Sequence, residues 1–494
     1  MLLYFILSSR DMVYFKRCMA QTYADEETMT TQDYSQLLAE LADDYTRHAP
    51  KSAALNQQAK KNLVDGGSHA LRLTQPFPPR IVAAQGAWLT DEDGHRILDL
   101  WQGHFANILG HNPEPITSVL SQAFADRFGL QTGFTDRLQV ETAEILCRQT
   151  GAEQARFTTS GTLATMNAML LARTFTGRNQ VLKVGGGWHG GHPWGLKGVG
   201  FHPDQPRSFH QVDTEGLSTR VTDEVVITRF NNPDKLVEHF RQYGDQLACF
   251  IVEPFAGAGG AIAATPEYLQ LARELTQKYG VVLIFDEVIA GFRFRAGDVG
   301  HLYGIQPDLG TFGKIMGGGM PVAAVTGRAD IMGLAGRPGG SRSNFSGGTY
   351  SAHPASMLAA RTMMAYLVEH EAEIYPRLAE LGRQARRTVE AAFAEAGLYA
   401  FCTGQSEALG SSSLSSLYFP YEAGRQLNTP EEAHNPAVCD LALSEQVLPL
   451  AMLLENVNLA HGQGAVSTAH TETDIEYLGE AYHRVAQRIR RHRR

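Results

Sequence analysis

Residues 281–321 read VVLIFDEVIAGFRFRAGDVGHLYGIQPDLGTFGKIMGGGMP, and this stretch decides the fold. Its first five residues, 281–285, form an apolar run rich in β-branched side chains, which is typical of a strand buried on both faces of a parallel sheet. That run ends at Asp286, and a second apolar run, 309–312, is followed closely by Lys314. We therefore expect Asp286 and Lys314 at the same edge of the sheet, where open α/β sheets bind their ligands.

A carboxylate and an amine at one sheet edge have two interpretations. The first is a structural salt bridge, which the pair taken alone favours, because charged residues at strand ends are common. The second is a site for pyridoxal phosphate (PLP), in which a lysine holds the cofactor as a Schiff base and an acidic residue binds the pyridine nitrogen. There the carboxylate keeps the ring nitrogen protonated, and the lysine later serves as a base.

The residues around the pair favour the second interpretation. DEVIAGFR at 286–293 and FGKIMGGGMP at 312–321 resemble the cofactor-lysine region of class III PLP-dependent aminotransferases, including glutamate-1-semialdehyde aminomutases. The resemblance implies that Asp286 is the pyridinium partner and Lys314 the Schiff-base lysine. It also implies PLP fold type I, an α/β fold with a mostly parallel sheet between helices in a large domain and a smaller α+β domain.

Residues 158–164, TTSGTLA, precede a helical pattern and are a candidate phosphate site. Ser160, Gly161 and Thr162 offer backbone N–H groups, two hydroxyls and the positive end of a helix dipole. A plain helix N-cap explains the same residues. The segment resembles the SGTEA phosphate loop of the family, in which the position of Leu163 carries a glutamate. Any polar contact made by that carboxylate is therefore lost here.

Residues 185–193, GGGWHGGHP, place an aromatic ring among glycines. By resemblance, Trp188 takes the position of the family's Tyr or Phe that stacks on the pyridine ring, with a larger stacking area. His189 follows it. Because no second metal-ligating partner accompanies it, we expect His189 to position the cofactor rather than to bind a metal.

Residues 249–260, CFIVEPFAGAGG, are a further apolar strand that ends at an acidic residue. Glu253 matches the family's VEP element. Ala258 stands where aminomutases usually carry an asparagine, so a side-chain contact near the ring hydroxyl of the cofactor is lost; some β-amino-acid aminotransferases share this alanine. The implied cofactor contacts also include Val288.

Residues 347–354, GGTYSAHP, resemble the family's GTYSANP segment. In the family this threonine binds the cofactor phosphate of the neighbouring subunit, and Thr349 is the match. The resemblance therefore implies a homodimer with two sites built across one interface.

The pattern along the chain divides it into four parts. We expect an N-terminal extension and helical arm at 1–66, a segment joining the small domain at 67–113, a large PLP-binding domain at 114–369 and a C-terminal small domain at 370–494. We expect the first thirty or so residues to be poorly ordered. The expected elements within these parts are helices at 34–45, 115–127 and 136–150, strands at 180–184, 224–228 and 249–252, a hairpin at 81–101 turning at Asp93-Gly94, and a Ser/Gly-rich loop at 404–416.

Composition narrows the functional class. The chain has 494 residues and a net charge of −9, which disfavours nucleic acid and anionic membranes as partners. Its five cysteines show no CxxC or zinc-site spacing, so we expect no metal, no disulfide framework and a cytoplasmic location. The apolar run at residues 2–7 is too short for a signal peptide or a membrane span. The sequence contains no P-loop, which disfavours a nucleotide-phosphate site of that kind.

Three activities are compatible with the resemblance. The favoured one is an aminotransferase that moves an amino group from an amino acid or amine to a keto or aldehyde acceptor, through the Lys314 Schiff base and pyridoxamine phosphate. The alternative is an aminomutase of the glutamate-1-semialdehyde 2,1-aminomutase type, which Leu163, Ala258 and a loop at 461–464 without a carboxylate disfavour. A catalytically silent scaffold is disfavoured by the joint presence of Asp286 and Lys314.

The segment GGSHALR at 66–72 holds two candidate substrate residues. Related enzymes bind the substrate carboxylate with a basic residue from this region. Arg72 suits this role because its planar fork binds a carboxylate with two hydrogen bonds and stays charged. His69 aligns if the gap is placed differently, and a surface arginine on a flexible loop is the alternative interpretation.

Overall fold

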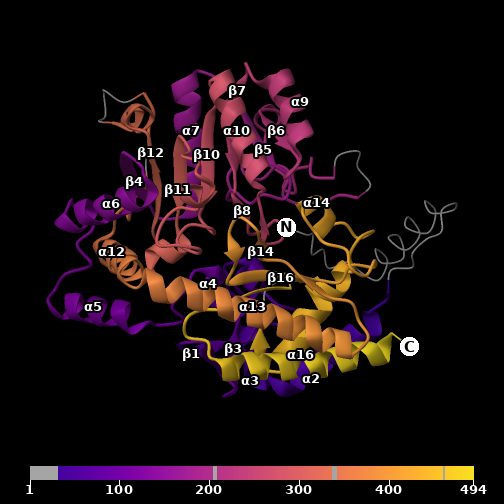
Figure 1. Cartoon of the computed structure of the whole chain (residues 1–494). Helices are drawn as coiled ribbons and strands as arrows, with labels where there is room; N and C mark the ends of the chain where they lie inside the picture. The colour runs from indigo at the N-terminus through magenta and orange to yellow at the C-terminus, as the bar shows by residue number, and fades with distance from the viewer. Residues whose placement is uncertain (1–31, 204–207, 337–341, 346, 460–461, 494) are drawn as a thin grey trace.

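The computed structural model describes residues 32–203, 208–336, 342–345, 347–459 and 462–493 (Figure 1). An upper α/β layer holds the large sheet, and a lower layer holds long helices and small sheets. The first thirty residues, for which we expect poor order, lie outside the described residues. Part of the 461–464 loop lies outside them as well. The four-part domain division stays a prediction.

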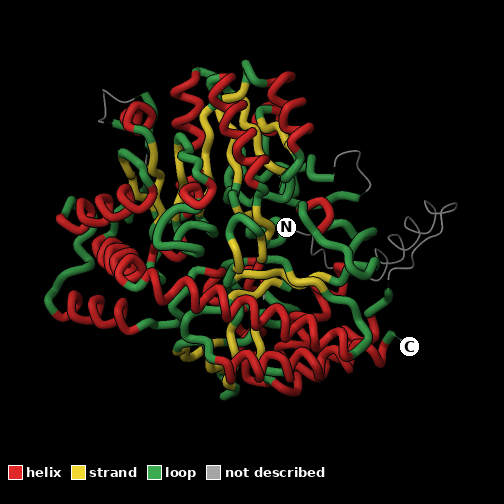
Figure 2. Tube along the Cα trace, in the orientation of Figure 1, coloured by secondary structure: helices red, strands yellow, loops and turns green. Residues whose placement is uncertain are grey.

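The upper layer is built on a seven-stranded sheet. Its spatial order is β4 (Gln154–Thr158), β12 (Ala323–Gly327), β11 (Leu309–Phe312), β10 (Val282–Glu287), β7 (Leu247–Val252), β5 (Gln180–Val184) and β6 (Val225–Thr228). β10 pairs in parallel with β11 and β7, whereas β12 is antiparallel to both β11 and β4. The expected mostly parallel sheet between helices is confirmed, and Figure 2 shows the strands flanked by helices.

Both faces of this sheet are covered, which explains the continuous apolar runs in its strands. Val282 and Ile284 pack in the cluster formed with α7 (Gly161–Thr176). Leu283 and Phe285 pack in the opposite cluster, which contains residues of α9 (Pro233–Tyr243) and α10 (Pro266–Tyr279). Alternation along the strand therefore gives each face its own core.

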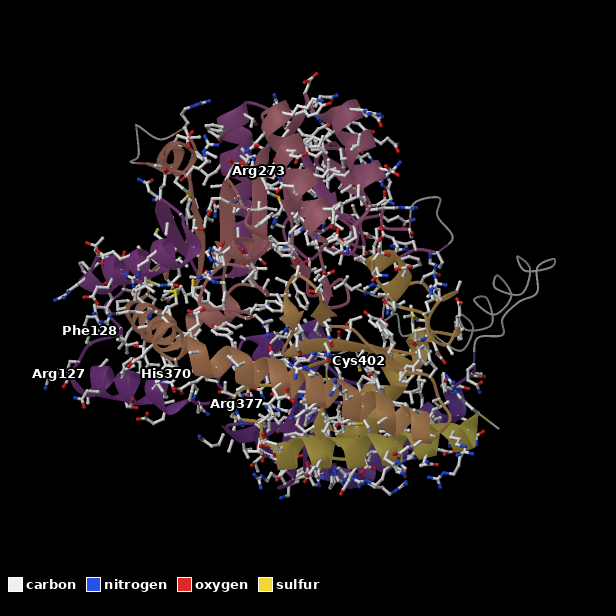
Figure 3. The ribbon with its side chains drawn as sticks, in the orientation of Figure 1. Arg127, Phe128, Arg273, His370, Arg377 and Cys402 are labelled. Carbon is white, nitrogen blue, oxygen red and sulfur yellow. The ribbon has the colours of Figure 1, made fainter. Side chains whose placement is uncertain are left out.

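A salt bridge ties α10 to the centre of the sheet. Arg273, labelled in Figure 3, donates to Asp308 Oδ2 at 3.0 Å. The same oxygen accepts from the Leu283 backbone at 2.8 Å, and Arg328 donates to Asp308 Oδ1 at 2.8 Å. Asp308 thus joins a helix, the strand β10 and the residue that follows β12, and its own burial is compensated by these donors.

The lower layer contains a four-stranded sheet and long helices. The sheet order is β1 (Ile81–Gln85), β2 (Trp88–Asp91), β3 (Arg96–Asp99) and β17 (Val457–Asn458). The predicted hairpin at 81–101 is correct at Gly94, but a second turn at Gly86, with φ 59°, divides its first half into two strands. α13 (Glu371–Glu395) and α16 (Glu472–His492) lie side by side below the large sheet (Figure 1).

The N-terminal arm and the helices beside the large sheet agree with the predicted helical segments. These are α2 (Ser35–His48), which continues into α3 (Pro50–Ala59), α5 (Glu114–Ala125) and α6 (Arg137–Thr150). The other helices are α4 (Gln102–Phe105), α8 (Thr219–Asp223), α11 (Ala329–Met332), α12 (Pro354–Glu369), α14 (Pro430–Ala433), a π-helical turn (Leu443–Val447) and α15 (Leu448–Leu454). Short 3-10 turns are η1 (Val64–Gly66), η2 (Ala70–Arg72), η3 (Gly300–Tyr303), η4 (Lys314–Gly317) and η5 (Gly333–Ala335).

The predicted Ser/Gly-rich loop at 404–416 is wrong in part, because strands form within it. They are β14 (Gln405–Ser406), β15 (Gly410–Ser411) and β16 (Leu414–Tyr418). β16 pairs with β13 (Phe401–Cys402) and β18 (Gln463–Ala465), and the remaining short strands are β8 (Phe255–Ala256) and β9 (Ile262–Ala263). The serines of β16 conceal the strand pattern, and partners from elsewhere in the chain stabilise it.

Within the described residues, no helix is long and apolar enough to cross a membrane. No group of three or more His, Cys, Asp and Glu side chains among them could hold a metal ion. The cysteines of this part of the chain, Cys147, Cys249, Cys402 and Cys439, are all free thiols.

Phe285→Ala should lower the free energy of unfolding by about 3–5 kcal/mol, because the ring is fully buried in the sheet and its removal leaves a cavity. The midpoint of urea denaturation, followed by circular dichroism, measures the loss. Phe175→Ala on α7 is the control, since that ring is 38% exposed and should cost far less. Equal losses for the two variants would contradict the assignment of Phe285 to the core.

Candidate active site

Neighbouring strands bring polar side chains to one point above the sheet. In β5, β7, β10 and β11, the residues that pack in the cluster with α7 include Val181, Ile251, Ile284 and Leu309. Side chains alternate along a strand, so the residues two positions further on face the same side. Those residues are Lys183, Glu253, Asp286 and Thr311, and all four are buried. The charged groups therefore converge on the face that α7 covers.

Asp286 is held by three hydrogen bonds. Its Oδ1 accepts from the Val288 backbone at 3.1 Å and from the Thr311 hydroxyl at 2.9 Å. Its Oδ2 lies 2.8 Å from His189 Nδ1. A carboxylate has about four acceptor sites, so roughly one remains for a ligand. Lys314 forms no ion pair with any described residue, and the Asp286–Lys314 salt bridge considered from the sequence is therefore not part of this structure.

His189 contacts Asp286 and helps to orient its carboxylate. Its ring is buried, with Nδ1 toward Asp286 and with Nε2 lacking a hydrogen-bond partner among the described residues. Burial lowers the pKa of His189, and the adjacent Asp286 raises it in part. The neutral ring with its proton on Nδ1 donates to the carboxylate, and the role of His189 toward the cofactor stays a prediction.

Glu253 fixes the backbone beside His189. Its Oε1 accepts from the Trp188 N–H and its Oε2 from the Gly257 N–H, each at 3.1 Å. Burial above all, together with the charge of Asp286, raises the pKa of Glu253 to about 8. The Trp188 indole is 39% exposed, so its ring is available to stack on a ligand. Ala258 is exposed and brings no polar side chain to this place.

Lys314 begins the turn η4 with φ 48°, in the left-handed region that a side chain occupies at a cost. The residue is largely buried, and no described residue forms a hydrogen bond or an ion pair with its amine. Burial lowers the pKa of Lys314, the nearby Asp286 raises it and Arg293 lowers it further. A lysine whose pKa is lowered has a larger share of the neutral, nucleophilic amine than an exposed lysine has.

The start of α7 provides the predicted phosphate segment. Ser160 is the N-cap, and its Oγ accepts from the Leu163 N–H at 3.3 Å. Gly161 allows a close approach, because an added Cβ would lie 2.8 Å from Val288 Cγ1. The Thr162 hydroxyl accepts from the Gly191 N–H at 3.4 Å. The N-cap interpretation is thus confirmed, and it leaves the other N–H groups of the first turn free of helical partners.

Arg72 and His69 lie near Lys314 as well. Burial lowers the pKa of His69, and the charges of Arg72 and Lys314 lower it further. Arg72 Nε donates to His104 Nε2 at 3.1 Å. Both candidate substrate residues are therefore in the neighbourhood of the lysine.

Thr349 stands apart from this group within one chain. It lies in the connection before α12, is exposed, and its hydroxyl makes no hydrogen bond with a described residue. The neighbouring Tyr350 is 61% exposed.

Several residues of the site were not predicted from the sequence. Thr311 and Lys183 left a signal, because each interrupts an apolar strand with a polar side chain. Lys183 Nζ donates to the carbonyls of Gly195 and Lys197 at 2.8 and 2.9 Å. His104 and Arg293 left no signal, since their neighbours are distant in sequence.

Comparisons with known proteins agree with this geometry. The family model for class III aminotransferases matches residues 72–394. Glutamate-1-semialdehyde 2,1-aminomutase 2 of Lachnoclostridium phytofermentans is 34% identical over 393 residues, which are 78% of this chain and 89% of that protein. These matches confirm the family resemblance that the motifs around Asp286 and Lys314 indicated.

Two solved structures share the fold. An omega-transaminase from Sphaerobacter thermophilus has 30% identity and a TM-score of 0.80, and the likeness covers 90% of this chain and 99% of that one. A transaminase with PLP bound has 27% identity and a TM-score of 0.78, with the same coverage of 90% and 99%. The expected α/β fold of PLP fold type I is thereby confirmed.

Glu253→Gln should change how stability depends on pH. Between the ordinary pKa of 4.5 and the raised value of about 8, native Glu253 keeps a proton that the unfolded chain has lost. Its contribution to stability is therefore full below the lower value and is lost as the pH rises through this window. A glutamine cannot ionise. From about pH 5 to about pH 8 the melting temperature of the variant should therefore rise relative to that of the wild type, by about 1 °C per kcal/mol for a chain of 494 residues.

The melting temperatures of both proteins across this pH range are the measurement. The exchanged amide adds an offset that is the same at every pH, so only the change in the difference is informative. Parallel curves would mean that Glu253 is already ionised in the native state.

Proposed function

The chain belongs to the class III aminotransferases, and we propose that it is a PLP-dependent enzyme that transfers an amino group between an amino acid or amine donor and a keto or aldehyde acceptor. The observation that carries this proposal is the arrangement of Lys314 and Asp286. A largely buried amine, which has no ion-pair partner in the described part of the chain, stands beside a buried carboxylate that is already oriented by other donors. A structural salt bridge would pair the two directly.

The residues present fit the cofactor. Lys314 would attach it through its free amine, and the remaining acceptor site of Asp286 would take the N–H of the pyridine ring. Ser160, Gly161 and Thr162 at the start of α7 would hold the phosphate, as a helix N-terminus does. The exposed Trp188 ring would stack on the pyridine ring.

Bound PLP supplies a conjugated ring that accepts the electrons left on the substrate carbon when its proton is removed. Lys314 Nζ would take that proton and return it, and the lowered pKa of this amine increases the share of its neutral form, which can accept a proton. Asp286 would hold the N–H of the ring. His189 donates from Nδ1 to Asp286 and so keeps the carboxylate in one orientation.

The transferase activity is favoured over the alternative, an aminomutase of the glutamate-1-semialdehyde 2,1-aminomutase type. Leu163 and Ala258 remove two polar contacts expected in aminomutases. An exchange within one molecule must also keep its diamino intermediate in the site, which polar closing groups would assist. The alternative is supported by the 34% identity to a protein that bears the aminomutase name.

We also propose that the enzyme is a cytoplasmic homodimer. Large apolar side chains are exposed on and around the connection between α5 and α6, where Figure 3 labels Arg127 and Phe128; they are Phe124 (46%), Leu130 (74%), Phe134 (74%) and Val140 (58%). The Ala355 N–H donates to the Gly129 carbonyl at 3.2 Å, which ties this connection to the segment after Thr349. A second copy would cover such a surface. Thr349 would then reach the cofactor phosphate of the partner subunit.

Lys314→Ala should abolish turnover and the visible absorbance of the bound cofactor, because the amine of Lys183, which lies on the same face of the sheet, is held by the carbonyls of Gly195 and Lys197. Panels of amino acids and amines are mixed singly with the holoenzyme, and the loss of the absorbance band identifies each donor. Lys278→Ala, exposed on α10, is the control and should behave as the wild type. The proposed function would be refuted if the Lys314 variant retained turnover. It would also be refuted if no donor and no acceptor changed the cofactor absorbance of the wild type.

A heterodimer of one Lys314→Ala subunit and one Thr349→Ala subunit should recover about half of the wild-type activity. If Thr349 acts across the interface, one site carries both lesions and the other carries neither. Isolated heterodimers with two different affinity tags allow the assay, and the two mutant homodimers are the controls. Heterodimers as inactive as these homodimers would place Thr349 in the site of its own subunit.

A further inference from the structure

Residues Gln102–Phe105 form a left-handed turn, which is rare for side chains other than glycine. Their φ angles are 44°, 61°, 60° and 66°. The three non-glycine residues, Gln102, His104 and Phe105, each occupy this region at a cost of about 1–2 kcal/mol. Such a turn persists only where contacts from the rest of the fold hold it. It packs against η4, the turn that begins at Lys314, so its side chains are close to the candidate active site.

Groups at both ends hold the turn. At its start, Asp99 accepts from the backbone N–H groups of Trp101 at 3.0 Å and Gln102 at 2.9 Å. Asp99 is itself fixed by His111 Nε2 at 2.7 Å. At its end, the buried guanidinium of Arg293 donates to the Phe105 carbonyl. The backbone on each side of His104 is therefore fixed before any ligand binds.

The contact between Arg72 and His104 defines the protonation of the imidazole. A guanidinium has no acceptor atom, so the hydrogen bond from Arg72 Nε requires a lone pair on His104 Nε2. The proton of the neutral ring is therefore on Nδ1. Burial above all, together with the charges of His69, Lys314 and Arg72, lowers the pKa of His104 to about 3, in agreement with a neutral ring.

The surroundings leave this Nδ1–H available. The Trp101 ring meets the imidazole edge-on at 4.4 Å, and the His69 ring lies 4.7 Å away. Neither contact takes a hydrogen bond from the ring, and Nδ1 has no partner among the described residues. The η nitrogens of Arg72 likewise donate to none of them. A set of unused donors thus stands near Lys314, whose charge acts on both histidines.

We propose that His104 is a specificity-determining residue that positions Arg72 to bind the carboxylate of the amino donor. His104 Nε2 accepts from Arg72 Nε and so holds the guanidinium, whose η nitrogens donate to the carboxylate. Carboxylate-bearing amino acids are then the preferred donors over simple amines. The assignment of this carboxylate to a substrate rests on the proposed function.

His104→Phe keeps the ring and removes both nitrogen atoms, whereas His104→Gln keeps an acceptor for Arg72. Phenylalanine and 2-phenylethylamine, which differ by the carboxylate alone, are the donor pair for kcat and KM. In the holoenzyme, isothermal titration with 3-phenylpropionate, which has no amine to transfer, measures the affinity without turnover. His483→Phe, exposed on α16, is the matched control, and melting temperatures report the fold of each variant.

His104→Phe should raise the KM for phenylalanine and the Kd for 3-phenylpropionate by about tenfold, the loss expected for one charge-assisted hydrogen bond. The kcat and the KM for 2-phenylethylamine should stay within about twofold, and His104→Gln should recover most of the affinity. Unchanged Kd values, equal losses on both donors, or a wild type that does not bind 3-phenylpropionate would overturn the proposal.

The two proposals fail in different ways. Turnover with a Kd that is insensitive to His104 would refute this inference and leave the proposed function standing. A His104-dependent Kd in a protein that converts no donor would refute the proposed function and retain the carboxylate site.

Discussion

A buried carboxylate at the carboxyl end of β10 sets the condition that the rest of the site must satisfy. Asp286 is 3% exposed, and an ionised carboxylate without partners at that depth would cost several kcal/mol. Its donors come from the residue that follows β10, from the neighbouring strand β11 and from the loop after β5. Only a parallel arrangement, in which these strands end at one edge, brings the donors together. The buried Asp286 carboxylate therefore requires this strand topology, because the topology supplies its hydrogen-bond donors.

Backbone strain is concentrated at two places around this carboxylate. Lys314 and the turn Gln102–Phe105 all have positive φ angles, and the two segments pack against each other. The strain at Lys314 directs an amine into a largely buried place, and the strain at His104 sets an imidazole beside Arg72. In both cases the cost is met by contacts from elsewhere in the fold, which is how strained backbone persists at functional sites.

Arg293 acts on both Lys314 and the turn Gln102–Phe105, on the first through its charge and on the second through a hydrogen bond. Its guanidinium is buried, donates to the carbonyls of Ile289 and Phe105 and to the Ser413 hydroxyl, and has no carboxylate partner among the described residues. Because its charge is uncompensated, it lowers the pKa of Lys314, and because its hydrogen bonds are directional, it fixes the turn that holds His104. The residue that supports the proposed substrate contact thus also favours the neutral form of the proposed catalytic amine.

The sequence by itself determined the strands β10 and β11, the start of α7 and the placement of Asp286 and Lys314 at one sheet edge. Those features depend on local patterns: apolar runs of strand length, a Ser-Gly-Thr helix start, and charged residues immediately beyond a strand. The turn at Gly86, the strand β16 within a serine-rich segment, the pairing of Asp286 with His189 and the turn around His104 were decided by the tertiary structure. Each depends on hydrogen bonds between residues far apart in the chain, and Gln102, His104 and Phe105 adopt left-handed conformations that their own side chains disfavour. Local preference cannot indicate the turn around His104, because Arg293, which donates to the Phe105 carbonyl, is brought there from a distant part of the chain.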